Sequence, residues 1–233
     1  MNRNSQSPFA NLTPVVKNLL IINLICFIPF IVLSGDKYQG LVVDNLGLFY
    51  FDSPHFRVWQ ILTYMFFHGG WTHILFNMFA LFSFGPILEY AIGPKRFFNL
   101  YFICGIGAAL FQMLVQAIEV HSMTGGFTLS LTASTQVDPA VYDKLAAIYG
   151  APTIGASGAI FGLLVAFGML YPDLELMLLF IPVPIKAKYI IPIYIIIEIV
   201  LGVGQFGGDN VAHFAHLGGA LLGFILIKIW RYR

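Results

Sequence analysis

The sequence is poor in charged residues, which make up only 10% of its 233 positions. An average soluble domain carries about 25% charged residues. Hydrophobic residues account for 58% of the chain, and a soluble protein of this length could not shield so much apolar surface from water. The shortage of charge therefore favours an all-α polytopic membrane protein, because helices satisfy their own backbone hydrogen bonds in lipid.

Cysteines, net charge and internal repeats are also scarce. The two cysteines, Cys26 and Cys104, lie in separate apolar runs and form no C-x-x-C pair, so we expect neither a disulfide framework nor a cysteine metal site. The formal net charge of +1 indicates no nucleic-acid partner. The absence of a repeat disfavours a small-solute transporter, since many transporters are built from inverted repeats.

Six apolar segments approach the length of about 20 residues that crosses a bilayer. No small-residue cleavage site follows the first of them near Leu33, which favours a retained span over a signal peptide. We therefore expect a flexible cytoplasmic tail over residues 1–14 and one membrane domain over residues 15–233. The expected spans cover residues 15–33, 71–90, 97–119, 155–171, 188–204 and 212–230.

The distribution of basic residues predicts an orientation for these spans. With the N-terminus in the cytoplasm, nine of the twelve Lys and Arg residues fall in inside segments and three in outside segments. This asymmetry agrees with the positive-inside rule, and six spans place both termini in the cytoplasm. A six-span core with short tails is typical of a bacterial protein, so we expect the bacterial inner membrane.

Two long loops are expected on the outer side. The first, residues 34–70, ends in an aromatic-rich piece that is too short to span, and we expect it to lie along the interface or to pack sideways against the bundle. The second, residues 120–154, contains a candidate short helix at 140–149. The orientation places Ser157 one turn into the fourth span, near the outer surface and within reach of water.

Small residues recur every four positions in the fourth and sixth spans, and so mark one face of each helix. Such faces allow two helices to approach closely in lipid. Each stripe alone is typical of ordinary packing, and a lone serine often bonds to its own helix. Ser157 and His216 each lie one position from a stripe, so packed stripes would bring them within about 2.6–3.2 Å. The stripes are Gly158, Gly162 and Ala166, and Ala215, Gly219 and Gly223.

The second span carries two polar side chains, His73 and Asn77, which are four residues apart and share a face. Polar groups in spans are costly and usually face the protein interior or water. Either residue alone would have a structural explanation. Together, near the depth of Ser157, they offer two hydrogen-bond donors where an acyl-transfer enzyme stabilises an oxyanion. The backbone N–H of Ser157, near a helix N-terminus, offers a third.

The chain resembles the rhomboid family of intramembrane serine proteases. The resemblance covers approximately residues 50–230. A segment between the second and third spans, Glu89-x-x-x-Gly93-x-x-Arg96-Phe97, is also similar to the family. The three main motifs, in order, are His73-x-x-x-Asn77, Gly155-Ala156-Ser157-Gly158 and Ala215-His216-x-x-Gly219-x-x-x-Gly223.

This resemblance implies a six-transmembrane-helix bundle with a long first outside loop. It implies that Ser157 is the nucleophile and His216 the general base, in a dyad without a carboxylate. His73, Asn77 and the Ser157 N–H would form the oxyanion hole. The substrates would be membrane proteins cut in or near a transmembrane segment in the lipid bilayer, with no metal or other cofactor. The pocket would be roofed by the first loop and by residues 207–210.

Other residues would support this site. Gly155, Gly158 and Gly219 belong to the motifs. Phe161, where some family members have tyrosine, could stack on His216 and orient its ring, because no acidic partner is evident in the sequence. The first loop has Gln60 after Trp59, where the family often has arginine. The loop at 120–154 could cap the site or influence substrate choice.

Two alternatives use the same residues. A metal-dependent membrane protein could bind its ion through His213, His216 and His73, but no carboxylate or cysteine lies at suitable spacing and no H-E-x-x-H is present. A non-catalytic relative could bind client helices, although the presence of both Ser157 and His216 argues against it. His213 ranks second to His216 as the base. Glu198, an unusual carboxylate within a span, is expected to bond to a neighbouring helix. The sequence leaves the oligomeric state and the physiological substrate open.

Overall fold

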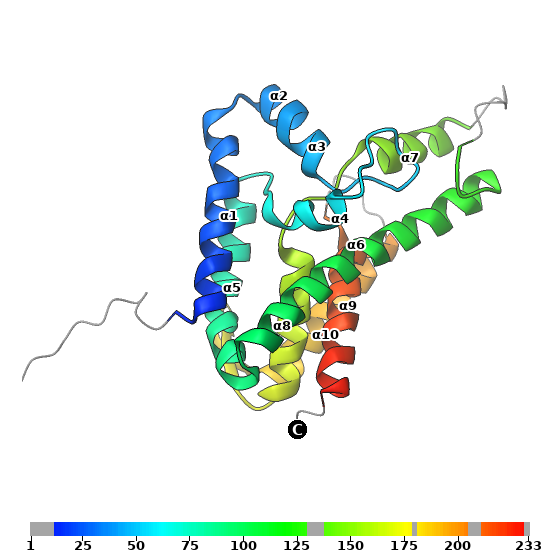
Figure 1. Ribbon diagram of the computed structural model, residues 1–233. Coiled ribbons are helices and arrows are strands. Elements are labelled where there is room, and N and C mark those ends of the chain that lie inside the picture. Colours follow the sequence, from blue (N-terminus) through cyan, green and yellow to red (C-terminus); the bar gives the residue numbers. More distant parts are fainter. Residues whose placement is uncertain (1–11, 130–137, 179–180, 205–210, 231–233) are drawn as a thin grey trace, which may run out of the picture.

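The computed structural model describes residues 12–129, 138–178, 181–204 and 211–230. Within these ranges, six long helices form a bundle, and the short helices of the connecting loops gather at one end of it (Figure 1). All six correspond to expected spans, although α6 extends beyond its predicted end. The expected flexible tail lies outside the described residues except for positions 12–14. The helices are α1 (Pro14–Val32), α5 (Trp71–Ile92), α6 (Pro94–Thr124), α8 (Ser157–Leu170), α9 (Ala187–Gly204) and α10 (His213–Ile229).

The six helices differ in length. Four of them, α1, α5, α6 and α9, are long and apolar enough to cross a membrane, whereas α8 and α10 are apolar but shorter. Helix α8 has 14 residues, and at 1.5 Å per residue it is about 21 Å long. This is less than the roughly 30 Å of the hydrocarbon core. If the C-terminal end of α8 reaches one face of the membrane, its first residue, Ser157, lies below the other face.

Glycine and proline set the turn between α5 and α6. Gly93 has a φ of 82°, a conformation that glycine adopts without steric penalty. Pro94 then begins α6, at a position where its missing N–H has no helical partner to lose. Gly125 ends α6 with a φ of 77°, as glycine commonly does after a helix. The break at Gly93 and Pro94 reverses the chain so that α5 and α6 become neighbours.

Glu89 fastens α1 to α5. Its carboxylate is 2% exposed and accepts hydrogen bonds from the backbone N–H groups of Val15 at 3.1 Å and Val16 at 3.0 Å. Free N–H groups in the first turn of a helix attract a negative charge. Glu89, near the C-terminal end of α5, therefore satisfies the first backbone N–H groups of α1.

The most closely packed part of the bundle consists of α6, α8 and α10. A Cβ atom on Gly219 would overlap the carbonyl group of Gly158, and one on Gly223 would overlap that of Gly162. A Cβ on Gly218 would lie 2.5 Å from the Cβ of Phe111 on α6. These approaches confirm that the two small-residue stripes face each other.

The first outside loop folds into short helical turns. The aromatic-rich piece at its end packs sideways against the bundle, which is one of the two arrangements expected from the sequence. The Tyr64 hydroxyl donates to the Gly105 carbonyl of α6 at 2.7 Å. Gln60 is fully buried; its Oε1 accepts from the Arg57 N–H at 3.1 Å and its Nε2 donates to the His55 carbonyl at 2.9 Å. The amide at this position thus ties the loop together. The turns are α2 (Gly35–Tyr38), π-helical η2 (Gln39–Val43), α3 (Asp44–Leu46), α4 (Gln60–Thr63) and 3₁₀-helical η3 (Tyr64–Phe66).

The second outside loop contains α7 (Pro139–Gly150), which confirms the short helix expected at 140–149. After α7 the chain pairs with the first loop through two backbone hydrogen bonds between Leu48 and Thr153, each 2.8 Å. The Tyr149 hydroxyl also donates to the Asp52 carboxylate at 2.7 Å. The two outside loops are therefore joined directly before the chain enters α8.

A small hairpin, which the sequence did not predict, connects α8 to α9. Strand β1 (Glu175–Leu178) pairs antiparallel with β2 (Ile181–Lys186), with Glu175 opposite Lys186. Pro182 and Pro184 in β2 argue against a strand when the sequence is considered alone, because proline cannot donate a hydrogen bond to a neighbouring strand. A two-stranded sheet consists only of edge strands, and these tolerate proline.

Candidate active site

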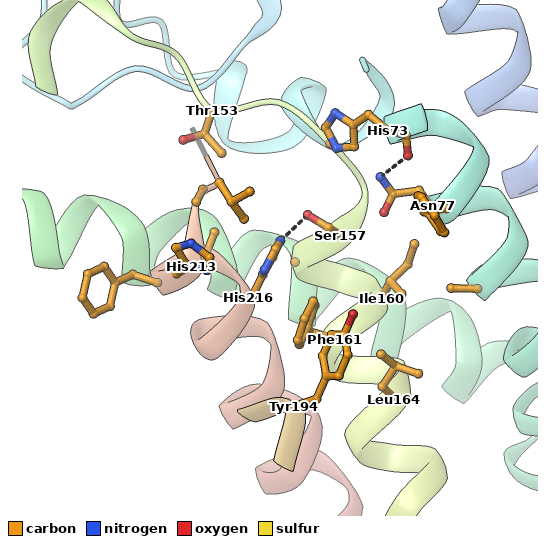
Figure 2. A pocket seen from close by; sticks show the side chains of 18 of the residues that line it. His73, Asn77, Thr153, Ser157, Ile160, Phe161, Leu164, Tyr194, His213 and His216 are labelled. Atoms are coloured by element: carbon orange, nitrogen blue, oxygen red, sulfur yellow. Dashed lines mark hydrogen bonds between the residues drawn. The ribbon is translucent and has the colours of Figure 1, made fainter. Parts of the chain in front are cut away.

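The hydroxyl of Ser157 and the imidazole of His216 are in direct contact. Ser157 is the first residue of α8, and His216 lies in the first turn of α10. Ser157 Oγ and His216 Nε2 are 2.7 Å apart (Figure 2). The packed stripes explain the contact, because each side chain emerges beside the line where the two helices touch. This geometry meets the requirement for a nucleophile beside its base.

Phe161 fixes the plane of the His216 ring. The two rings are stacked with centroids 4.3 Å apart and an interplanar angle of 9°. Phe161 is one helical turn beyond Ser157 and is buried. The predicted stacking is confirmed. Helix α8 therefore contacts the imidazole through two side chains, the stacked ring of Phe161 and the hydroxyl of Ser157.

The expectation that His216 has no acidic partner is wrong. Glu198 Oε2 on α9 lies 2.9 Å from His216 Nδ1. The expected bond of Glu198 to a neighbouring helix is confirmed, but its partners are the histidines of α10. The sequence did contain a signal: Gly202 follows Glu198 by four residues and so shares its face. A Cβ on Gly202 would lie 3.1 Å from the Cβ of His213, so the glycine lets this face of α9 approach α10.

The objection to a metal site, that no carboxylate lies at suitable spacing, is also wrong. Potential ligand atoms of Glu198, His213 and His216 all lie within 4.8 Å of one another. Among the described residues this group does not include His73. Glu198 Oε2 is 2.7 Å from His213 Nδ1, a hydrogen-bond distance like the one to His216. These three residues are the candidates for holding an ion.

His73 presents a ring N–H toward the serine. Its Nδ1 accepts from the Gly69 backbone N–H at 3.4 Å, and a ring nitrogen that accepts leaves the proton on the other nitrogen. That nitrogen, Nε2, adjoins Gly155: a Cβ on Gly155 would lie 2.5 Å from it and 3.7 Å from Ser157 Oγ. Gly155 has a φ of 128°, which side-chain-bearing residues rarely adopt. Glycine is thus required there for both conformation and space.

Asn77 lies one turn below His73 on α5 and is 6% exposed. Figure 2 shows both side chains projecting from α5 toward Ser157. The Asn77 amide donates one hydrogen bond to the His73 carbonyl at 3.0 Å. An amide group has two N–H donors, so the second is available to another acceptor. Side-chain donors thus stand on the α5 side of the serine and the base on the α10 side.

His68 is a buried neighbour of this site. Its side chain is fully buried, and its ring lies edge-on to His73 with centroids 5.0 Å apart. Burial, with a smaller contribution from His73, lowers the pKa of His68 to about 3. His68 is therefore uncharged at neutral pH and adds no charge beside His73.

A cavity of about 1530 Å³ is lined by Ser157, Asn77 and three histidines, which are His73, His213 and His216. Polar side chains of α6, namely Gln112, Gln116 and Glu119, line one part of it. Apolar side chains of α5 and α9, including Phe79 and Ile195, line another. Residues 147–148 and 151–154 of the second outside loop also line it, so this loop does border the site. The expected contribution of residues 207–210 to the roof lies outside the described residues.

Comparisons with known proteins agree on one family. A family model described as the rhomboid domain matches residues 55–233. The chain is 31% identical over 168 residues to the mitochondrial rhomboid protein 1 of Saccharomyces cerevisiae, covering 71% of this chain and 40% of that protein. It is 30% identical over 174 residues to rhomboid protease AarA of Providencia stuartii, covering 72% and 54%.

A third relative matches over a longer stretch. The mitochondrial RHOMBOID-like protein 12 of Arabidopsis thaliana is 27% identical over 212 residues, covering 91% of this chain and 56% of that protein. The chain thus spans about half the length of these curated relatives.

Proposed function

The chain belongs to the rhomboid family, and from that premise we propose that it is a serine endopeptidase that cleaves membrane proteins in or next to a transmembrane segment. Members of the family are typically serine intramembrane proteases, although some are inactive, so the proposal depends on the site itself. The observation that carries it is the 2.7 Å contact between Ser157 Oγ and His216 Nε2 within a cavity that also holds His73 and Asn77.

In the proposed reaction Ser157 is the nucleophile and His216 the base. The Ser157 hydroxyl attacks the scissile carbonyl carbon while His216 Nε2 accepts its proton. His216 then gives this proton to the leaving amine as the C–N bond breaks. A water molecule, activated by the same nitrogen, hydrolyses the acyl-enzyme and restores Ser157. The stacked Phe161 ring keeps the imidazole in position through both steps.

The negative charge that forms on the carbonyl oxygen would be held by three N–H donors: His73 Nε2, the second N–H of Asn77 and the backbone N–H of Ser157. The Ser157 N–H begins α8 and therefore has no partner in its own helix. Donors arranged before the reaction stabilise such a charge without having to reorient. Gly155 permits this arrangement, since any side chain there would meet His73.

Water and substrate would reach the serine from different directions. The polar α6 side chains that line the cavity provide a route for water, which a cleaved peptide bond consumes. Apolar residues of α5 and α9 line the opposite route, and an apolar passage suits a segment arriving from lipid. The 14-residue length of α8, shorter than the hydrocarbon core, supports a position of Ser157 below the membrane surface, where a transmembrane segment could present its outer end.

We also propose that both termini face the cytoplasm and that the membrane is the bacterial inner membrane. The first part rests on the nine-to-three distribution of basic residues. The relatives are bacterial, mitochondrial or chloroplast proteins, and a multi-pass membrane location is common to the family. Cysteines introduced at Lys95 and Lys144 test the orientation: an impermeant thiol reagent applied from outside should modify only the second.

The direct test uses purified protein in liposomes with a model substrate whose transmembrane helix contains helix-breaking residues. The wild type should cleave it, and Ser157→Ala should not. Ser122→Ala is the matched control, because the Ser122 hydroxyl is exposed and donates to the Glu119 carbonyl of its own helix. Full activity of a folded Ser157→Ala variant would overturn the proposal. Substrate binding without cleavage by the wild type would instead support the non-catalytic, client-binding alternative.

A further inference from the structure

Glu198 is a buried carboxylate in the middle of an apolar helix. It is 6% exposed, and α9 around it consists almost entirely of aliphatic residues. A carboxylate at membrane depth is costly unless it is paired or hydrogen-bonded. Its oxygen Oε2 has two such partners, His216 Nδ1 at 2.9 Å and His213 Nδ1 at 2.7 Å. Both partners are ring nitrogens, and one of them belongs to the base of the proposed reaction.

The contact with Glu198 determines which nitrogen of His216 carries the proton. An ionised carboxylate only accepts hydrogen bonds, so the nitrogen beside it, Nδ1, must be protonated. The neutral ring then has a free lone pair on Nε2, which faces the Ser157 hydroxyl at 2.7 Å. This is the form of imidazole that can accept the serine proton. Without a partner at Nδ1, the ring could also adopt the opposite form, which cannot act as the base.

We propose that Glu198 is a positioning residue for His216, so that Ser157, His216 and Glu198 operate as a triad. The carboxylate keeps the Nδ1–H form of His216 before the reaction and stabilises the imidazolium after the ring accepts the serine proton. It does not itself accept a proton. This inference rests on the proposed function and replaces the dyad without a carboxylate that the family resemblance implied.

His213 fixes the carboxylate in turn. It lies three residues before His216 on α10, and its Nδ1 donates to the same oxygen. The two rings are nearly perpendicular, with an interplanar angle of 87°, so they approach Oε2 from different directions. Two donors on one oxygen restrict the Glu198 side chain more than His216 alone would. His213 therefore contributes indirectly, and its loss should matter less than that of Glu198.

The distances favour this arrangement over a metal site made by the same three residues. Ligands that bind zinc at about 2.0–2.1 Å in a tetrahedral site are separated from one another by roughly 3.3 Å. The two nitrogen–oxygen distances of 2.7 and 2.9 Å are shorter and match hydrogen bonds of a charged acceptor. Zinc at this position would also occupy the Nδ1 lone pair of His216 and prevent the proposed tautomer from forming.

The test compares steady-state cleavage by the wild type, Glu198→Gln and His213→Phe in liposomes. The glutamine retains the shape of the side chain but loses its charge, and its N–H₂ group can drive His216 into the wrong tautomer. We expect the kcat of Glu198→Gln to fall by about 10²–10⁴-fold with little change in KM, as for the acid of a serine triad. The kcat of His213→Phe should fall by less than about tenfold.

A pH profile separates positioning from a merely structural bond between α9 and α10. Without the carboxylate, the imidazolium of His216 is less stable, so the acidic limb of the kcat/KM profile should move to lower pH in Glu198→Gln. Among the described residues, the other titratable groups that line the cavity with His216 are His73 of α5, His213 of its own helix, Glu119 of α6, Tyr64 of η3 and Tyr194 of α9. Of these, His213 also loses its contact with Glu198 in this variant. The same pH comparison is therefore made between His213→Phe and the double variant Glu198→Gln, His213→Phe, where a shift that persists can be assigned to His216.

The outcomes distinguish this inference from the proposed function. If the wild type cleaves the substrate and Ser157→Ala does not, the proposed function holds whatever Glu198 does. The inference is then overturned if Glu198→Gln retains wild-type kcat and pH profile per folded molecule, or if His213→Phe loses as much activity. It is also overturned if active wild-type protein contains one equivalent of zinc and loses its activity on chelation.

Discussion

The two sides of Ser157 are built differently. On one side, α8 meets α10 and α6 through glycine and alanine, so closely that Cβ atoms on Gly219 or Gly223 would overlap backbone carbonyl groups. On the other side, α5 and α9 pack less closely against α8, and both line a cavity of about 1530 Å³. Exposed apolar side chains cover the outer faces of both helices, for example Leu75 and Ile196. The tight side thus holds the reacting groups, and the open side leaves room for a substrate.

This difference suggests a division of tasks within one small bundle. A nucleophile and its base must keep a contact of 2.7 Å, which only a rigid pair of helices can maintain. A segment of another membrane protein must at the same time be admitted from lipid. Substitutions of the contact glycines on the tight side should therefore impair folding and activity together, whereas substitutions of polar residues on the open side should affect the reaction and leave the fold intact.

The largest effect is expected from Gly219→Leu on the tight side. The new side chain would overlap the carbonyl group of Gly158 and force α8 and α10 apart. Overpacking of this kind typically lowers the free energy of unfolding by about 3 kcal/mol, and cleavage should become undetectable. Gly150→Leu is the matched control, since a Cβ there meets nothing within 4 Å. Equal thermal unfolding midpoints for the two variants, measured in detergent, would refute the role of the tight side.

Asn77→Ala on the open side should slow the reaction without harming the fold. Loss of one oxyanion donor typically lowers kcat by about 10²–10³-fold. The Asn77 side chain makes one hydrogen bond within its own helix, so the thermal midpoint should change little. Ser83→Ala, at another cavity-lining position of α5, serves as the control in the same cleavage assay. A kcat within twofold of the wild type would exclude Asn77 from the oxyanion hole.

His68, buried beside His73 of the open side, should make the stability of the fold sensitive to acid. Because burial lowers the pKa of His68 from 6.5 to about 3, protons bind the unfolded chain more readily than the folded one. The contribution of neutral His68 to stability is complete above pH 6.5 and is lost toward pH 3, by about 1.4 kcal/mol per pH unit. His68→Leu should remove this slope in a comparison of unfolding free energies at pH 6.5 and 5.5. Parallel slopes for both proteins would show that folding does not shift the pKa of His68.

The smallest effect is expected from Phe161→Leu, which removes the ring stacked on His216 but retains an apolar side chain. The imidazole then has more freedom to rotate away from Ser157, and kcat should fall by about tenfold, or about 1.4 kcal/mol of activation free energy. Phe161→Tyr retains an aromatic ring and should keep near wild-type turnover. Identical kcat values for the leucine variant and the wild type would show that the stack does not orient the base.

Much of this fold could be predicted because lipid imposes simple rules. Apolar segments of sufficient length marked all six long helices, and the period-four stripes predicted which two of them would touch. Residues near those stripes, Ser157 and His216, therefore meet as expected. The proline-containing strand β2 was missed, because its residues argue locally against a strand, and only its pairing with β1 explains it.

Glu198 shows the limit of such reasoning. Its isolated carboxylate was visible in the sequence, but its partner was not, since contact with His216 depends on how α9 lies against α10. The pair Glu198 and Gly202 marks one face of α9, and this signal is weaker than a repeated stripe. The protonated nitrogen of His73 likewise depends on a backbone N–H from Gly69, which no pattern of side chains reveals.

The most direct test of the central claim, that His216 activates Ser157 as a nucleophile, is covalent labelling of the purified protein with a fluorophosphonate followed by peptide mass mapping. We predict a single adduct on Ser157 that is absent in Ser157→Ala and forms at least about 100-fold more slowly in folded His216→Ala. An adduct that persists in Ser157→Ala, or that forms at the wild-type rate without His216, would contradict the claim.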